Sequence, residues 1–252
     1  MTPLELLIDL HAPQARQGPG SDAATRRAIE LAGLKPSTDL AIADVGCGTG
    51  ASALVLAREL GACVTAVDAM PEFIDRLRAR AARAGLDARI RPAVERMEAL
   101  ACKDESLDAI WSEGAIYNMG FEAGVRAWRR LLKPRGVLAV SDLSWTTGAR
   151  PRDIEDHWER EYAGIDTPSG KFRVLERAGY TPIGFFFLPR DCWEENYYTP
   201  LEAGMKAFLT RHPGIAAARS IVEDLQQEIN FFREHGQWFG YGFYIARRSD
   251  GV

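Results

Sequence analysis

The stretch that decides the fold is Asp44-Val45-Gly46-Cys47-Gly48-Thr49-Gly50. It follows a continuous apolar run at 40–45, which predicts a buried strand, and it precedes a predicted helix at about 52–60. Glycines allow positive φ angles and let a ligand approach the main chain closely. The loop therefore predicts a ligand crevice at the carboxyl end of a parallel strand.

Strands and helices alternate outward from this loop, from Leu40 to Asp142. Further strands are predicted at 63–67, 89–94, 107–112 and 137–141, and Pro92 places the third near an edge. One helix starts at Pro71, and another at about 121–132 ends in the turn sequence KPRG. The pattern predicts an α/β fold, a Rossmann-like, doubly wound, mostly parallel sheet of seven strands with helices on both faces and helical cap insertions.

The remainder of the chain has a different pattern. Loops and short helices are predicted at 143–170, a helix at 171–178, a strand at 183–188, one long helical stretch at 200–235 and a last strand at 241–246. We expect a single domain over 1–252, with N-terminal helices or a lid (1–38), a cofactor-binding core (39–142) and a region (143–252) that holds the substrate cap, the last two strands and the helical insertion.

Composition excludes several classes of protein. The chain has 252 residues, of which 26% are charged and 46% hydrophobic, and this excludes a disordered chain, a collagen-like repeat and a disulfide miniprotein. A net charge of −4 provides no general field for nucleic acid or anionic lipid. Neither a spanning segment nor a signal peptide is recognisable, and four cysteines without metal spacing predict reduced thiols in the cytoplasm and no metal.

Charge near the loop bears on the ligand. Gly46, Gly48 and Ala51 also fit the loose dinucleotide pattern GxGxxG/A. Asp44 would repel a pyrophosphate if its carboxylate faces the site, whereas it favours a ligand with an ammonium and a sulfonium group. Asp68, which ends the second strand, can accept hydrogen bonds from both hydroxyls of an adenosine ribose, or it can serve as a turn residue before Pro71.

These residues resemble the class I S-adenosylmethionine-dependent methyltransferases, whose first motif reads (D/E)xGxGxG, over about Leu40 to Asp142. The resemblance implies that Gly46, Gly48 and Gly50 cradle the methionine and ribose part of the cofactor and that Asp68 holds the ribose. Where many relatives have an acidic residue near the adenine, this sequence has Arg96, which cannot accept a hydrogen bond. The main-chain amide of Met97 can still bind the ring, and either Glu95 or Glu98 can replace the acid.

A closer resemblance, to largely uncharacterised bacterial small-molecule methyltransferases, rests on 16–21 (RQGPGS) and 111–118 (WSEGAIYN) and extends over most of the chain. It brings Arg16, Gly18 and Glu113 into the expected cofactor site. An arginine fork suits the cofactor carboxylate, and Glu113 is expected to face the methionine end or the substrate. The alternatives are a surface arginine and a helix-capping glutamate.

The resulting prediction is an enzyme that uses S-adenosyl-L-methionine, without a metal, to methylate a small molecule by in-line displacement, leaving S-adenosyl-L-homocysteine. The catalytic residue is not identified; His157, Tyr117 and Glu113 are candidates for it. The expected substrate-binding residues are Tyr117, Trp145, His157, Trp193 and Tyr197. The alternatives are a non-catalytic S-adenosylmethionine- or nucleotide-binding module and an NAD-dependent reductase. We expect no nucleic-acid or membrane partner, and the oligomeric state, a homodimer included, stays open.

Overall fold

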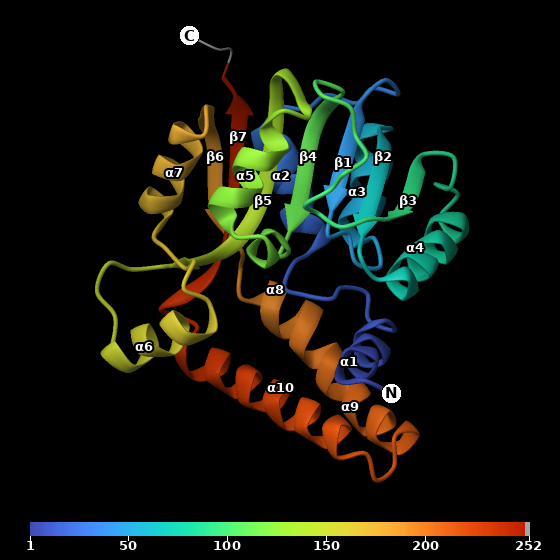
Figure 1. The fold of residues 1–252 in the computed structure, drawn as a ribbon, viewed down its shortest axis with the longest axis vertical. Helices are drawn as coiled ribbons and strands as arrows, with labels where there is room; N and C mark the ends of the chain where they lie inside the picture. The colour runs from blue at the N-terminus through green and yellow to red at the C-terminus, as the bar shows by residue number, and fades with distance from the viewer. Residues whose placement is uncertain (250–252) are drawn as a thin grey trace.

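Seven strands form one sheet in the order β3-β2-β1-β4-β5-β7-β6 in the computed structural model, which describes residues 1–249 (Figure 1). The first five strands run parallel, and β7 is antiparallel to both β5 and β6. The strands are β1 (Ala41–Val45), β2 (Cys63–Asp68), β3 (Ile90–Val94), β4 (Leu107–Glu113), β5 (Leu132–Trp145), β6 (Tyr180–Phe187) and β7 (Phe239–Arg248). The predicted fold class is confirmed, and so is the edge position of the strand that contains Pro92.

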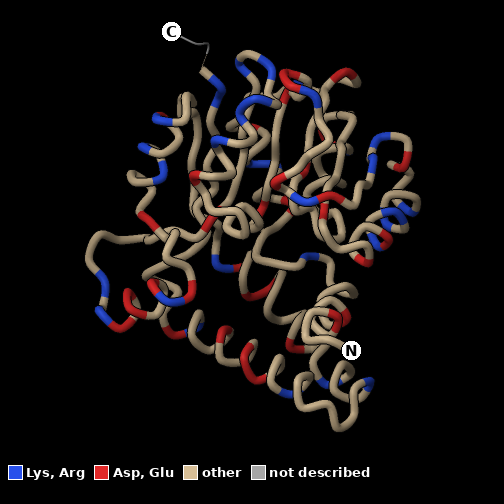
Figure 2. Tube along the Cα trace, in the orientation of Figure 1, with Lys and Arg blue, Asp and Glu red and all other residues tan. Residues whose placement is uncertain are grey.

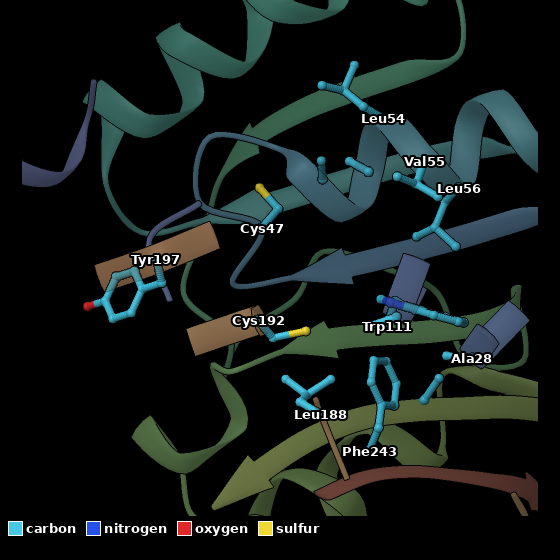
Figure 3. Packing of buried hydrophobic residues seen from close by; sticks show 14 of the residues in the cluster. Ala28, Cys47, Leu54, Val55, Leu56, Trp111, Leu188, Cys192, Tyr197 and Phe243 are labelled. Carbon is cyan, nitrogen blue, oxygen red and sulfur yellow. The ribbon is translucent and has the colours of Figure 1, made fainter. Parts of the chain in front are cut away.

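Helices cover both faces of the sheet because its strands bury side chains on both sides. Ile42 packs toward α2 (Asp22–Ala32), α3 (Ala51–Leu60) and α4 (Pro71–Arg83), all of which contribute to one core cluster. Ala43 and Val45 point to the opposite face, toward α5 (Phe121–Arg129) and α7 (Pro168–Arg177). Figure 3 shows part of the first cluster, in which the rings of Trp111 and Phe243 lie 5.7 Å apart.

A second layer of helices lies beyond the carboxyl ends of β1, β2 and β4 (Figure 1). It contains α1 (Pro3–His11), α6 (Arg152–Glu161), the short α8 (Asp191–Trp193), the π-helical turn η2 (Glu194–Tyr198), α9 (Thr199–Arg211) and α10 (Ala216–His235). The 3-10 turn η1 (Ile116–Asn118) follows β4 at the same edge. This layer places side chains from both ends of the sequence over the glycine loop.

Two predicted boundaries differ from the structure. The helical stretch at 200–235 is two helices, because Pro213 and Gly214, the latter with φ 76°, interrupt it. The fifth strand is much longer than predicted, because its pairing with β7 extends to Trp145 opposite Phe239. The predicted KPRG turn is a local bend within β5, where Arg135 has φ 62°.

A buried ion pair fixes the segment after β5. Lys171, 2% exposed, donates to the carboxylate of Asp142, which is completely buried. The Lys171 ammonium also donates to the carbonyl of Gly164 at 3.0 Å and lies 4.5 Å from the ring centroid of Phe121. Tyr162 donates a further hydrogen bond to Asp142 at 3.0 Å. These contacts connect the loop and helix that follow β5 to the sheet.

We expect Lys171→Met to lower the free energy of unfolding by about 3–5 kcal/mol, because it leaves Asp142 buried without its cation. Arg152→Met is the matched control, since Arg152 and its partner Asp156 are 80% and 43% exposed. The control should cost less than about 1 kcal/mol. Urea denaturation measures both values, and equal losses would contradict the role assigned to the buried pair.

Candidate functional site

One cavity of about 690 Å³ lies at the carboxyl ends of β1, β2 and β4. The glycine loop after β1 forms one side of it, and the N-terminal segment of residues 16–19 forms another. The cavity continues past the loop to side chains of α1, η1, η2 and α10. It therefore has a loop half, beside β1 and β2, and a helical half, beneath the second layer.

The glycine loop needs its glycines for two different reasons. Gly46 and Gly48, with φ 71° and 54°, line the cavity. A Cβ on Gly46 would lie 2.3 Å from the Cβ of Ala115, so no residue with a side chain fits there without a shift of its neighbours. Gly50, with φ 88°, is not among the described residues that line the cavity, and a Cβ there would lie 2.1 Å from Leu77 of α4. Its role in the structure is to let α3 start close to α4, and its place in the predicted cofactor cradle stays a prediction.

Asp68 ends β2 with its carboxylate at the cavity wall. One oxygen accepts a hydrogen bond from the amide of Gly48 at 2.9 Å, and the other accepts one from the amide of Met70 at 2.9 Å. Burial raises the pKa of Asp68, and the two amides oppose that shift. Each carboxylate oxygen has two lone pairs, so both keep accepting capacity toward a ligand.

Asp44 is not among the described residues that line the cavity, so its carboxylate does not face the cavity directly, and its part in cofactor binding stays a prediction. It points to the sheet face covered by α3, where Ser52 donates to its Oδ2 at 2.6 Å. Its Oδ1 is buried and has no hydrogen-bond partner among the described residues. Burial raises the pKa of Asp44 to about 7. Ser52 lines the cavity, so this carboxyl group is one hydrogen bond away from it.

Arg16 and Glu113 line the cavity and bind each other. Nη1 of Arg16 donates to Oε2 of Glu113 at 2.9 Å, and Nη2 donates to Asp22 at 3.1 Å. Trp111 and Thr25 donate to the other oxygen of Glu113, at 2.9 and 2.6 Å. Arg16 and Glu113, both predicted for the cofactor site, therefore lie together. In the structure their ion pair attaches the N-terminal segment to the end of β4.

Gln17 is a site residue that sequence reasoning missed. Its Oε1 accepts the amide of Thr49 in the glycine loop at 2.8 Å, while its Nε2 donates to the carbonyls of His11 and Gln14 at 3.2 and 3.1 Å. Gln17 thus connects the segment after α1 to the loop. Gln17 belongs to the RQGPGS stretch, whose resemblance to other methyltransferases was the one sequence signal that pointed to it. A lone glutamine indicates no particular chemistry. Gly18 of the same stretch lines the cavity.

Residues 95–98 form the wall of the loop half beyond Asp68. The carbonyl of Met97 accepts a hydrogen bond from Trp128 at 3.0 Å, which fixes the main chain there. Arg96 is exposed and donates to Glu98 at 3.3 Å, and Glu95 accepts the amide of Ala101 at 2.9 Å. Arg96 is thus neutralised by Glu98, and one oxygen of Glu95 is already occupied.

The helical half contains two of the five predicted substrate residues, Tyr117 and Tyr197. In Figure 3, Tyr197 lies at the edge of the packed cluster and its hydroxyl points away from the other labelled side chains.

Trp145, His157 and Trp193 are not among the described residues that line the cavity. The ring of Trp145 is covered by Arg150 at 4.0 Å, that of His157 stacks on Phe231 at 4.0 Å, and that of Trp193 stacks on Phe232 at 4.4 Å. The partners of His157 and Trp193 come from a distant helix, α10, and the partner of Trp145 lies five residues further along the chain, so we leave the three out of the proposed site.

His11 lines the cavity, although the sequence offered no constellation for it. Its Nδ1 lies 2.9 Å from the carbonyl of Leu7, which identifies Nδ1 as the protonated nitrogen of the neutral ring. Its Nε2 lies 3.4 Å from the hydroxyl of Tyr197. Burial lowers the pKa of His11, so the ring is a neutral base at pH 7.

The sheet and the cavity at its carboxyl edge define a Rossmann-like α/β protein, and comparison with known proteins makes the class specific. A family described as a methyltransferase domain matches residues 42–136. A ubiquinone biosynthesis O-methyltransferase of Roseobacter denitrificans is 31% identical over 173 residues, which cover 64% of this chain and 68% of that relative. The chain therefore belongs to the S-adenosylmethionine-dependent methyltransferase family, and it is an S-adenosylmethionine-dependent methyltransferase.

Two solved structures share the fold. A methyltransferase of Geobacter sulfurreducens in complex with S-adenosyl-L-homocysteine has a TM-score of 0.82 at 17% identity, over 96% of this chain and 97% of that one. The [4+2]-cyclase SpnF has a TM-score of 0.77 at 20% identity, over 98% of this chain and 93% of that one. At these identities the likeness concerns the fold alone.

Gly46→Ala should destabilise the protein more than Gly61→Ala, which is the matched control. Both positions have positive φ, 71° and 63°, but a Cβ on Gly61 meets no atom within 4 Å. Gly61→Ala should cost roughly 1–2 kcal/mol of backbone strain. Gly46→Ala should cost a further 1–3 kcal/mol or so, because the Cβ of Ala115 has no rotamer to escape into. Urea denaturation of both variants measures the difference, and equal costs would contradict the close approach.

Proposed function

We propose that the chain methylates a small molecule, with the cofactor in the loop half of the cavity and the acceptor in the helical half. The observation that carries this proposal is the continuity of one cavity from the bare glycine loop to His11, Tyr117 and Tyr197. Bound there, S-adenosylmethionine would supply a methyl group on a sulfonium, ready for in-line attack. The protein would then orient the acceptor and exclude water.

Each part of the loop half has a proposed role. Asp68 would accept the ribose hydroxyls, and Gly46 and Gly48 would allow the nucleoside to lie against the main chain. The unpartnered Oδ1 of Asp44 would stabilise a positively charged methionine end through the polar wall at Ser52. The free amide of Met97 would face the adenine, while Arg16 and Glu113 close the methionine end.

His11 is our proposed proton acceptor in the helical half. A hydroxyl or a protonated amine must lose a proton before it attacks as a nucleophile, and a neutral imidazole near Tyr197 can take that proton. Tyr117, a predicted candidate, lies in the same half, where it would contact the acceptor. Glu113 is engaged by three donors, so we assign it a positioning role.

A small acceptor is supported by the size of the cavity, about 690 Å³, and by the charge distribution. Acidic and basic residues alternate along the described chain (Figure 2), and the net charge of −4 provides no general basic field of the kind that nucleic-acid binding uses. Within residues 1–249, no helix is long and apolar enough to cross a membrane. Four free cysteines are consistent with action in the cytoplasm, which we include in the proposal.

Asp68→Ala should weaken binding of S-adenosylhomocysteine at least about tenfold, because a hydrogen-bonded carboxylate contributes on the order of 1.5–3 kcal/mol. Isothermal titration calorimetry measures the affinity, with exposed Asp75→Ala on α4 as the control. Unchanged affinity in Asp68→Ala would remove the ribose contact. Binding of NAD in place of S-adenosylhomocysteine would overturn the cofactor assignment.

Binding should also weaken as the pH falls through the pKa of Asp44, which is about 7. An ammonium group on the ligand favours the charged carboxylate and lowers this pKa on binding, so protonated protein binds less well. From about pH 8 to about pH 6, affinity for S-adenosylhomocysteine should drop by up to about tenfold. Asp44→Asn should flatten this dependence, and an identical profile in the variant would exclude Asp44 as its source.

A further inference from the structure

Glu228 is an acidic residue in the helical half of the cavity without a cationic partner. It lies on α10, lines the cavity, and accepts one hydrogen bond, from the hydroxyl of Tyr198 at 3.0 Å. Within residues 1–249, no Lys, Arg or His forms an ion pair with it. The basic residue one turn further along α10, Arg233, binds Glu194 and Glu202 instead.

Four tyrosines lie near enough to this carboxylate to interact with its charge, and they come from three elements: Tyr117 from η1, Tyr197 and Tyr198 from η2, and Tyr241 from β7. Tyr117 is 41% exposed and lines the cavity, as Tyr197 and Glu228 do. Burial raises the pKa of all four phenols, so they stay neutral at pH 7. The tyrosines therefore supply rings and hydroxyls but no positive charge.

The basic residues that line the cavity are already paired. Arg16 binds Glu113 and Asp22, and Arg96 binds Glu98. His11, close to Tyr197, is kept neutral because burial lowers its pKa. Within the described chain, the helical half therefore presents one acidic group and no basic group free to oppose it.

Glu228 keeps solvent-accessible surface and lines the cavity, so its carboxylate is open to a ligand there. A ligand that carries positive charge would pair with it, whereas a carboxylate or phosphate ligand would be repelled. Aromatic rings add to the preference, because their negative faces attract a cation within about 6 Å. A neutral alcohol gains neither effect.

We propose that the acceptor substrate is a small amine, bound as its ammonium ion against Glu228 among the rings of Tyr117 and Tyr197. This inference rests on the proposed function, because it takes the helical half of the cavity as the acceptor site. It restricts the substrate class to molecules with a basic nitrogen, whichever of their atoms receives the methyl group.

The test is calorimetric titration of the full chain, saturated with S-adenosylhomocysteine, with two matched probe sets. One set is 2-phenylethylamine, 2-phenylethanol and phenylacetate, and the other is hexylamine, hexanol and hexanoate. We expect at least one amine to bind about tenfold or more tightly than its alcohol and its carboxylate, as one desolvated ion pair permits. Glu228→Gln keeps an oxygen for the Tyr198 hydroxyl and should abolish this selectivity.

Glu223→Gln is the matched control, since Glu223 is an acid on the same helix that is not among the described residues lining the cavity, and it should bind the probes as the wild type does. Amines that bind no more tightly than their alcohols, or a preference that survives Glu228→Gln, would overturn the inference. Titration of the same samples with S-adenosylhomocysteine separates the two proposals. If that ligand fails to bind, the proposed function fails, and if it binds while the amine preference is absent, only the inference about the substrate fails.

Discussion

The ion pair between Arg16 and Glu113 is the interaction on which the site depends. Both side chains are nearly enclosed, 10% and 8% exposed, so the pair carries a desolvation cost that its Coulomb attraction alone does not repay. Hydrogen bonds from Trp111 and Thr25 to Glu113, and from Arg16 to Asp22, offset that cost. Since Glu113 ends β4, the network fixes the N-terminal segment to the edge of the sheet where ligands of this fold bind.

That attachment shapes both halves of the cavity. Immediately beside Arg16, Gln17 accepts the amide of Thr49 and so contacts the glycine loop directly. A few residues earlier, the same segment contains His11, whose ring lies next to Tyr197 in the helical half. The stretch from His11 to Gly18 therefore contributes to both halves of the cavity. Its later residues line the loop half, and His11, the proposed base, lies in the helical half.

The central sheet was predictable from sequence because its signals are local. Apolar runs that end in glycines determine buried strands and the loop after β1, whatever the rest of the chain does. The side of the sheet toward which Asp44 points was not predictable, because it depends on strand register and on α3 above it. His157 and His11 illustrate the same limit: one stacks on Phe231 and the other reaches the cavity, and only tertiary packing decides between them. The break between α9 and α10, by contrast, has a local signal, since Pro213 and Gly214 are typical helix-ending residues, and the prediction of one helix over 200–235 did not use it.

Three acidic groups near the site, Asp142, Asp44 and Glu228, differ in how their charge is compensated. Asp142 is bound by Lys171, so the folded protein satisfies it without any ligand. Asp44 and Glu228 accept hydrogen bonds from the hydroxyls of Ser52 and Tyr198, and within residues 1–249 no cationic side chain forms an ion pair with either. A fold under selection for stability alone would replace or pair a buried acid such as Asp44. Asp44 lies behind the glycine loop and Glu228 lies in the helical half, where a cationic nucleoside and a cationic acceptor would each supply a positive charge. Pairing with these two carboxylates would favour positively charged ligands over anionic ones.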